Sequence, residues 1–213
     1  MSSQDAQAET DKTAGWRGSR ELWLEAARQA FVESGLEAVK IQPLAARLDL
    51  SRTSFYWFFK DRGALLQALL ELWEARNTGA IQTACEAYAE TLPEAVLTLI
   101  AAFLEETGFE PRFDFAVRGW AHRDAAVAAR VQAADEARLA AIRAMFTRFG
   151  LPATEADVRA RTVYLTQMGY ISMQVQETLE TRLARISDYV TIFARQPPQP
   201  NEMARFRARF GRG

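Results

Sequence analysis

The chain has 213 residues, a formal net charge of −1, one cysteine and one histidine. A hydrophobic fraction of 49% and a charged fraction of 25% are ordinary for a globular protein with a substantial core in one or two domains. No apolar run reaches the ~18–20 residues of a membrane-spanning helix, and the polar residues 1–13 lack the apolar segment of a secretory signal. The lone Cys85 excludes an intramolecular disulfide framework, and Cys85 and His122 offer few zinc ligands. We therefore expect a cytoplasmic protein with no membrane contact, metal or cofactor.

Charge is distributed unevenly along the chain. Residues 12–62 contain nine basic and six acidic side chains, so this segment carries +3 and the remainder carries −4. The asymmetry permits a basic docking face near the N-terminus without requiring one.

Apolar residues recur at spacings of three and four, and alternating strand-like stretches are absent. This pattern predicts an all-α protein of about nine helices. Ser19 is expected to cap the first helix and Gly35 to end it, Pro43 stands in the first turn of the second helix, and Asp49 forms a turn before the cap Ser51. The expected helices cover residues 19–35, 42–48, 52–59, 62–88, 93–108, 113–121, 124–150, 154–180 and a last segment ending near 195.

Residues 51–62 combine a helix cap, small polar side chains, aromatic residues and flanking basic residues. Two short helices joined by a tight turn and backed by a third form a helix-turn-helix, whose second short helix meets base edges in the DNA major groove. Phe55 and Phe59 are expected to anchor that helix to its own domain. The alternative is a surface helix of an unrelated bundle. The DNA-contacting residues are expected to be Arg52, Thr53 and Ser54 at the bases, Tyr56, Trp57 and Lys60 along the backbone, and Arg62 at a phosphate.

Residues 22–66, about a fifth of the chain, resemble the DNA-binding domain of the TetR/AcrR family of bacterial transcriptional regulators. The resemblance is carried by the alanine-rich helix that ends in Phe31 and Gly35, by an Ile-x-x-Leu-Ala-x-x-Leu helix, by Ser-x-x-Ser-Phe-Tyr, and by a Lys-Asp-Arg-x-x-Leu-Leu run. Trp57 and Phe58 stand where the family commonly has a basic residue and a histidine, which leaves the usual phosphate contacts there in question.

The resemblance implies an all-helical domain for ligand sensing and dimerisation after the helix-turn-helix. The expected division is therefore a flexible arm at 1–18, the DNA-binding domain at 19–62, the effector-binding and dimerisation domain at 63–195, and a C-terminal tail at 196–213. The basic tail is expected to be a frayed terminus, with a contact to DNA or lipid as the alternative. Cys85 is expected to be a buried thiol, with oxidant sensing as the alternative.

Bulky residues in the middle of the chain either line an effector pocket or pack the core. Phe103, Trp120, Phe146 and Met168 are the preferred lining residues. Asp114, Arg118 and His122 are spaced to share one helix face, where Arg118 and His122 would bind a ligand carboxylate or phosphate; the alternative is an ion pair beside a solvated histidine.

Apolar residues on two faces of the 154–180 helix indicate two packing partners, one of which would be a second subunit. The expected dimer interface comprises Tyr170, Ile171, Gln174, Ile186, Tyr189 and Phe193.

Together these features predict a ligand-responsive transcriptional regulator that binds a palindromic operator through the major groove as a homodimer. Repression relieved by a small-molecule effector is the favoured interpretation. The rival interpretations are an activator or a ligand-independent DNA-binding protein of the same fold, and then an all-helical enzyme. The enzyme comes last because no phosphate-binding loop or catalytic triad is recognisable in the sequence.

Overall fold

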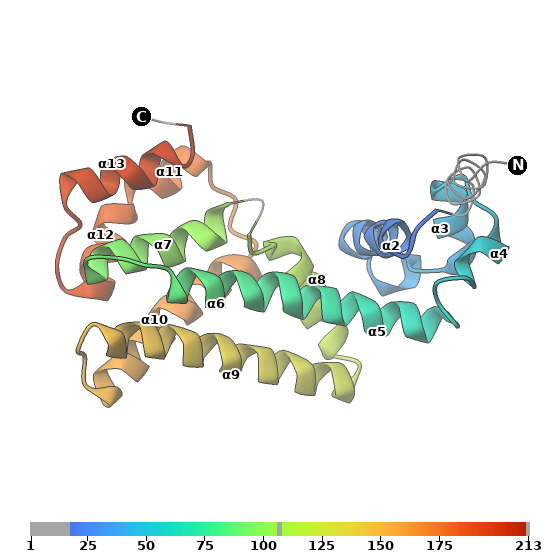
Figure 1. Cartoon of the computed structure of the whole chain (residues 1–213), viewed down its shortest axis with the longest axis horizontal. Coiled ribbons are helices and arrows are strands. Elements are labelled where there is room, and N and C mark those ends of the chain that lie inside the picture. The colour runs from blue at the N-terminus through green and yellow to red at the C-terminus, as the bar shows by residue number, and fades with distance from the viewer. Residues whose placement is uncertain (1–17, 106–107, 212–213) are drawn as a thin grey trace, which may run out of the picture. The chain divides into compact units, whose positions relative to one another are not determined.

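The computed structural model describes residues 18–105 and 108–211, and all regular elements in these ranges are helices (Figure 1). The all-α prediction is therefore confirmed. By contacts the chain divides into two compact units, Met1–Trp73 and Glu74–Gly213. The expected flexible arm lies, apart from Gly18, outside the described residues.

The first helix among the described residues of the first unit is the one predicted at 19–35. Ser19 Oγ accepts a hydrogen bond from the Leu22 amide at 3.1 Å, and Gly35 ends the helix with a φ of +78°. Asp49 makes the later turn in the left-handed region, with a φ of +53°. The elements in the described part of this unit are α2 (Arg20–Ser34), the 3-10 turn η1 (Leu36–Ala38), α3 (Ile41–Arg47), α4 (Arg52–Phe55) and α5 (Arg62–Trp73).

Helix α2 packs against α3 and α5, and α3 packs against α4. The core that these contacts enclose is aromatic and aliphatic. Its fully or nearly fully buried members include Trp23, Phe31, Val39, Leu44, Phe55, Leu65, Leu69 and Trp73.

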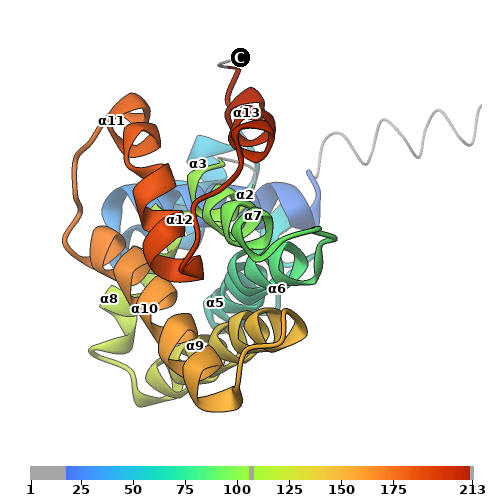
Figure 2. The ribbon, with the colours of Figure 1, turned by 90° about the vertical axis from the view of Figure 1, so that its left-hand side faces the viewer.

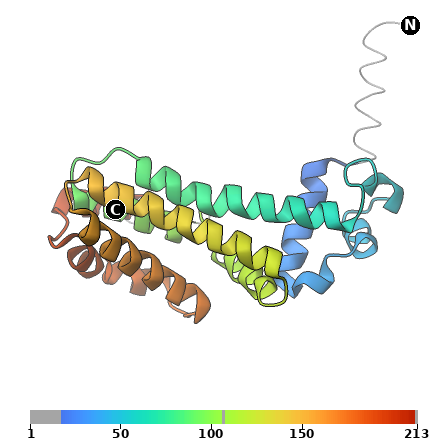
Figure 3. The same ribbon diagram turned by 90° about the horizontal axis from the view of Figure 1, so that it is seen from below.

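The second unit is a helical bundle around a single apolar cluster. Helix α9 contacts α6, α8 and α10, while α7 contacts α6, α12 and α13. Figure 2 views this bundle from one end, and Figure 3 shows α9 and α10 side by side along their lengths. The elements are the π turn η2 (Glu74–Thr78), α6 (Gly79–Glu86), α7 (Leu92–Leu104), α8 (Pro111–Ala121), α9 (Ala125–Arg148), α10 (Ala153–Ser172), α11 (Leu179–Ala184), α12 (Ile186–Ala194) and α13 (Pro200–Ala208).

Two of the longer predicted helices need correction. The helix predicted at 62–88 contains the π turn η2 and ends at Glu86. The helix predicted at 154–180 ends at Ser172, because Gln174 adopts a left-handed φ of +49° and the chain then starts a separate helix, α11.

The predicted tail is also different, because residues 200–208 form helix α13, docked on α7. Phe206 is buried, and the buried Glu202 carboxylate accepts hydrogen bonds from Thr91 Oγ1 and from the Gln199 amide, both at 2.6 Å. The described part of the tail is therefore an ordered element of the second unit. No helix among the described residues is long and apolar enough to span a membrane.

Candidate nucleic-acid interface and effector pocket

Helix α4 is short and strongly capped. Ser51 Oγ accepts a hydrogen bond from the Ser54 amide at 3.3 Å, which marks the helix start as predicted. After Phe55 the backbone continues in tighter turns, in which the Tyr56 amide bonds to the Thr53 carbonyl and the Trp57 amide to the Ser54 carbonyl. The regular α-helix is therefore shorter than the predicted 52–59 segment.

Two buried aromatic side chains anchor this segment to the core of the first unit. Phe55 and Phe59 are 0% and 4% exposed, and their ring centroids lie 5.5 Å apart. Phe55 also meets Trp23 of α2 edge to face at 5.3 Å, and the Arg20 guanidinium lies 5.2 Å from the Phe59 ring centroid. The anchoring that the spacing predicted is present.

The opposite side of the segment carries exposed side chains of the kinds that bind DNA. Arg52, Thr53 and Lys60 are exposed, and Tyr56 and Trp57 have exposed fractions of 55% and 64%. Large aromatic side chains with so much exposed surface commonly mark an interaction site. We call residues 52, 53, 56, 57 and 60 the recognition face.

The structure corrects two expected DNA contacts. Ser54 is 3% exposed, and its hydroxyl donates to the Ser51 carbonyl at 2.8 Å, so it serves the helix cap instead of meeting bases. The guanidinium of Arg62 donates to the carbonyls of Val39 at 2.6 Å and Leu36 at 2.9 Å. Arg62 thus holds the turn between α2 and α3 instead of reaching for a phosphate.

A family model described as bacterial regulatory proteins, tetR family, matches residues 24–69. These residues run from α2 through the recognition face into α5, so the match includes the capped segment and its aromatic anchors. The N-terminal unit carries the DNA-binding domain of the TetR family. Together with the all-helical fold, this match supports a transcriptional regulator with an N-terminal helix-turn-helix.

Solved structures agree with this fold. The TetR family transcriptional regulator PfmR from Thermus thermophilus is 21% identical, with a TM-score of 0.60 over 83% of this chain and 99% of that chain. GusR from Salmonella enterica is 18% identical, with a TM-score of 0.60 over 83% of this chain and 95% of that chain. At these identities the likeness concerns the fold alone. No functionally curated protein matches the sequence.

The expected effector-lining residues are mostly core residues of the second unit. Phe103 and Phe146 are 4% and 0% exposed, and with Met168 they belong to the apolar cluster of the bundle. Trp120 is half-buried on α8. None of these four lines either of the two cavities described below, and the burial of Phe103, Phe146 and Met168 in the apolar cluster fits the alternative of plain core packing better.

One of these cavities, of about 610 Å³, lies among α8, α9 and the end of α10. Arg118 and His122, both predicted ligand contacts, are among its lining residues, together with Asp135. We call it the α8–α9 pocket. His122 is exposed there, whereas Arg118 is largely buried and engaged in ion pairs.

The Arg118 guanidinium binds two carboxylates. Its Nε donates to Asp114 at 2.7 Å, and its two Nη atoms donate to Asp135 at 2.9 and 2.6 Å. Burial lowers the pKa of Arg118, but the hydrogen bond to Asp135 and the two negative charges outweigh burial and hold that pKa above its ordinary value. The predicted ion pair of Arg118 with Asp114 is therefore present, and it is part of a larger network.

The sequence did not point to Arg138, which is fully buried and lies 3.0 Å from the equally buried Asp114. Arg138 also donates to Thr78 Oγ1 at 3.0 Å and to the Tyr164 hydroxyl at 3.1 Å. An i, i+3 spacing of Asp135 and Arg138 on α9 was the available signal, but it does not distinguish a solvated pair from a buried one. Burial also raises the pKa of the Tyr164 hydroxyl, which donates to Asp135 at 2.6 Å.

The expected dimer residues are also largely internal. Ile186 and Phe193 are 4% and 3% exposed, so both belong to the core of the protomer. The Tyr170 and Tyr189 hydroxyls bond to each other at 3.0 Å. Ile171 is half-buried against the core and Gln174 is exposed in the turn after α10. The outward face of α10 is formed by other residues.

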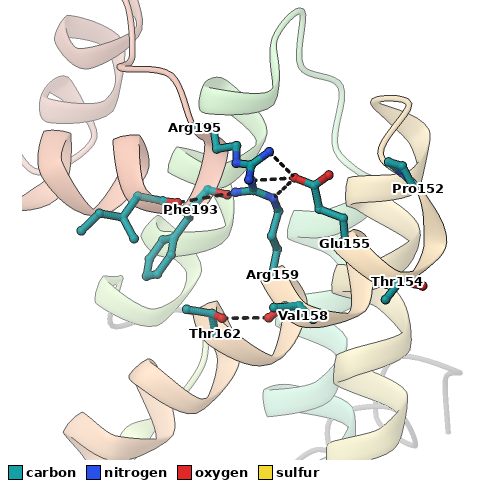
Figure 4. Close-up of a pocket in the computed structure, with 9 residues that line it drawn as sticks. Pro152, Thr154, Glu155, Val158, Arg159, Thr162, Phe193 and Arg195 are labelled. Carbon is teal, nitrogen blue, oxygen red and sulfur yellow. Dashed lines mark hydrogen bonds and ion pairs between the residues drawn. The ribbon is translucent and has the colours of Figure 1, made fainter.

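The other cavity, of about 590 Å³, lies between the start of α10 and the end of α12 (Figure 4). Val158 and Thr162 of α10 and Ile192 of α12 line it, and Arg159 borders it, donating to the Phe193 carbonyl and to Glu155. Val158 and Ile192 are 59% and 65% exposed. This groove is thus open to solvent, with exposed apolar side chains beside the charged Glu155, Arg159 and Arg195.

Cys85 is 2% exposed within the core of the second unit. Burial raises the pKa of its thiol to about 12. The buried-thiol interpretation of Cys85 is therefore favoured over oxidant sensing.

Proposed function

We propose that this TetR-family protein represses transcription by binding a palindromic operator as a homodimer, and that a small-molecule effector releases it. The observation that carries the DNA-binding part is the recognition face, where exposed basic and aromatic side chains stand on a segment anchored by Phe55 and Phe59. Arg52, at the first position of α4, has the reach and geometry to pair with a guanine edge. Lys60 follows the segment and is suited to a phosphate contact.

The dimer is proposed to form through the outward face of α10. Val158, Thr162 and Leu165 follow helical spacing, and Val158 and Leu165 are each 59% exposed. Gly169 continues this row, and a Cβ built there meets no atom within 4 Å, so nothing inside the protomer requires a glycine at this position. Exposed aliphatic side chains next to the groove at Ile192 suit a self-complementary contact. A two-fold dimer in turn favours an inverted-repeat operator.

The proposal is tested by selecting duplexes from a random-sequence library with the purified full-length protein and measuring their affinity over a range of salt concentrations. We expect an inverted repeat to be enriched. Failure to retain any duplex at low salt, with the protein folded, would overturn the proposed function.

Two variants separate base reading from phosphate attraction. Arg52→Ala is expected to relax base preference at one position of each half-site, at a cost of ~1–3 kcal/mol for the preferred base. Lys60→Ala is expected to weaken all duplexes alike and to reduce the salt slope by about one unit for each phosphate that it no longer neutralises. Arg207→Ala, which changes an exposed residue of α13, is the matched control and should alter neither property. Equal losses with unchanged base preference in both test variants would contradict the assignment.

A further inference from the structure

The α8–α9 pocket joins an apolar wall to a wall of hydrogen-bond donors. Phe115 and Val131 contribute apolar surface, while Arg118, His122 and Gln132 contribute N–H groups and Asp135 contributes a carboxylate. A volume of about 610 Å³ is in the range of small-molecule sites. The Arg118 N–H groups are bonded to Asp114 and Asp135, so a ligand acceptor reaches Arg118 by replacing one of these carboxylates, with an apolar body of the ligand against Phe115 and Val131.

Asp135 already occupies the position that such an acceptor would take. Its two oxygens accept from the two Nη atoms of Arg118, and its side chain is 28% exposed, so it has a route to solvent. A ligand carboxylate that replaces Asp135 takes over its bonds to Arg118 and to the Tyr164 hydroxyl, while the Asp135 carboxylate turns to solvent. Neither Arg118 nor Asp135 is then left as an uncompensated buried charge. The apolar body against Phe115 and Val131 then supplies the net driving force.

The same ion network extends from the pocket to η2. Arg118 shares Asp114 with Arg138, at N···O distances of 2.7 and 3.0 Å. Asn77 Nδ2 lies 3.4 Å from Asp114 Oδ1, and Arg138 Nε donates to Thr78 Oγ1 at 3.0 Å. Asn77 and Thr78 belong to η2, and π turns inside helices are frequent at functional sites.

We propose that the α8–α9 pocket binds a small amphipathic carboxylate, whose acid group replaces Asp135 on Arg118, and that this exchange alters η2 through Asp114 and Arg138. In the unliganded protein the ion pairs of Arg118 and Arg138 with Asp114 and Asp135 make the site neutral. Its link to gene regulation rests on the proposed function, because η2 directly follows α5 in the chain.

The binding test uses octanoate and phenylacetate as probes, each compared with its neutral amide. Melting temperature and calorimetric affinity are measured on the full-length protein. We expect at least one acid to raise the melting temperature and to bind more tightly than its amide by about tenfold, the effect of a charge-assisted hydrogen-bonded pair. No stabilisation by either acid, or equal stabilisation by acid and amide, would overturn the proposal.

Adjacent alanines on α9 offer a matched pair of variants. Ala128 lines the pocket and Ala129 does not, and both are exposed, so a tryptophan is compatible with the fold at either position. Ala128→Trp should abolish acid binding, whereas Ala129→Trp should leave it unchanged. Asp135→Asn removes the competing charge and should tighten acid binding by about tenfold. Acid binding that survives Ala128→Trp would place the acid elsewhere and contradict the proposal.

Hydrogen exchange of the backbone amides of residues 74–78 tests the transmission step. Saturating acid should change their exchange rates in the parent protein and in Ala129→Trp, but not in Ala128→Trp. An unchanged rate with acid bound would contradict the route through Asp114 and Arg138. Affinity of the unliganded protein for its selected duplex is measured separately. Duplex binding without acid binding rejects only this inference, whereas the absence of duplex binding rejects the proposed function.

Discussion

At the scale of single residues, neighbouring positions on the recognition segment have opposite roles. Phe55 is fully buried and Tyr56 is 55% exposed, although both are aromatic and their ring centroids lie only 5.3 Å apart. The backbone direction decides the role, since a short helix fixed by its cap turns successive side chains to different sides. Ser54 is the polar example, because its side chain is buried and its hydroxyl donates to the Ser51 carbonyl.

Cys85 gives a residue-scale prediction about reactivity. Burial raises the pKa of its thiol from 9.0 to about 12, more than the nearby Arg148 charge lowers it. The folded protein at pH 8 should therefore react with iodoacetamide far more slowly than the urea-unfolded protein, as followed by mass spectrometry. Fast alkylation of the folded chain would contradict this account.

The raised pKa of the Cys85 thiol also predicts how the stability of the protein changes with pH. Between pH 9 and 12 the unfolded state loses the thiol proton and the folded state keeps it. The unfolding free energy should fall with rising pH in that window, by at most ~1.4 kcal/mol per pH unit, and this contribution should be absent in Cys85→Ala.

At the scale of elements, α13 is held by a buried acidic side chain. Glu202 links the Gln199 amide to the Thr91 hydroxyl, and Thr91 itself caps α7 by accepting from the Glu94 amide at 3.2 Å. Glu202→Ala should lower the unfolding free energy by ~1–3 kcal/mol, because it removes two part-buried hydrogen bonds to a carboxylate. Urea unfolding measures this change, and Arg207→Ala should stay within about 0.5 kcal/mol of the parent. Equal stability of both variants would show that α13 does not contribute to the folded unit.

The elements also show what a sequence does and does not predict. Ser19, Gly35, Asp49 and Ser51 act locally, through caps and left-handed turns, and the boundaries that they predict in the first unit are those observed. The π turn η2 has no local signal of this kind, because its side chains Asn77 and Thr78 are bound by groups from α8 and α9.

The site residues divide in the same way. The recognition face was predictable because residue type and short spacing identify it within one segment of the sequence. Its five members are all exposed: Arg52, Thr53, Tyr56, Trp57 and Lys60. The pocket and dimer residues depend on which faces meet in three dimensions. Phe146 and Phe193 fit the patterns of lining, interface and core equally well, and the structure shows that both are core.

At the scale of the whole molecule, the proposed dimer depends on one exposed row of α10. Leu165→Asp places a charge in that row and should convert a dimer to a monomer in light scattering with size-exclusion chromatography. Glu136, on α9, is exposed, and Glu136→Asp is the matched control that should leave the oligomeric state unchanged. A Leu165→Asp variant that keeps the parent's mass would exclude this row as the subunit contact.

Site-specific photo-crosslinking tests the central claim, that the recognition face meets DNA. Benzoylphenylalanine at position 57 replaces a side chain that is 64% exposed, and at position 88 it replaces Tyr88, which is 86% exposed on the second unit. The account predicts a protein–DNA adduct with the selected duplex from position 57, competed by the unlabelled selected duplex and not by a scrambled one, and no such adduct from position 88. An adduct from position 88 and none from position 57, under conditions where the duplex is bound, would contradict it.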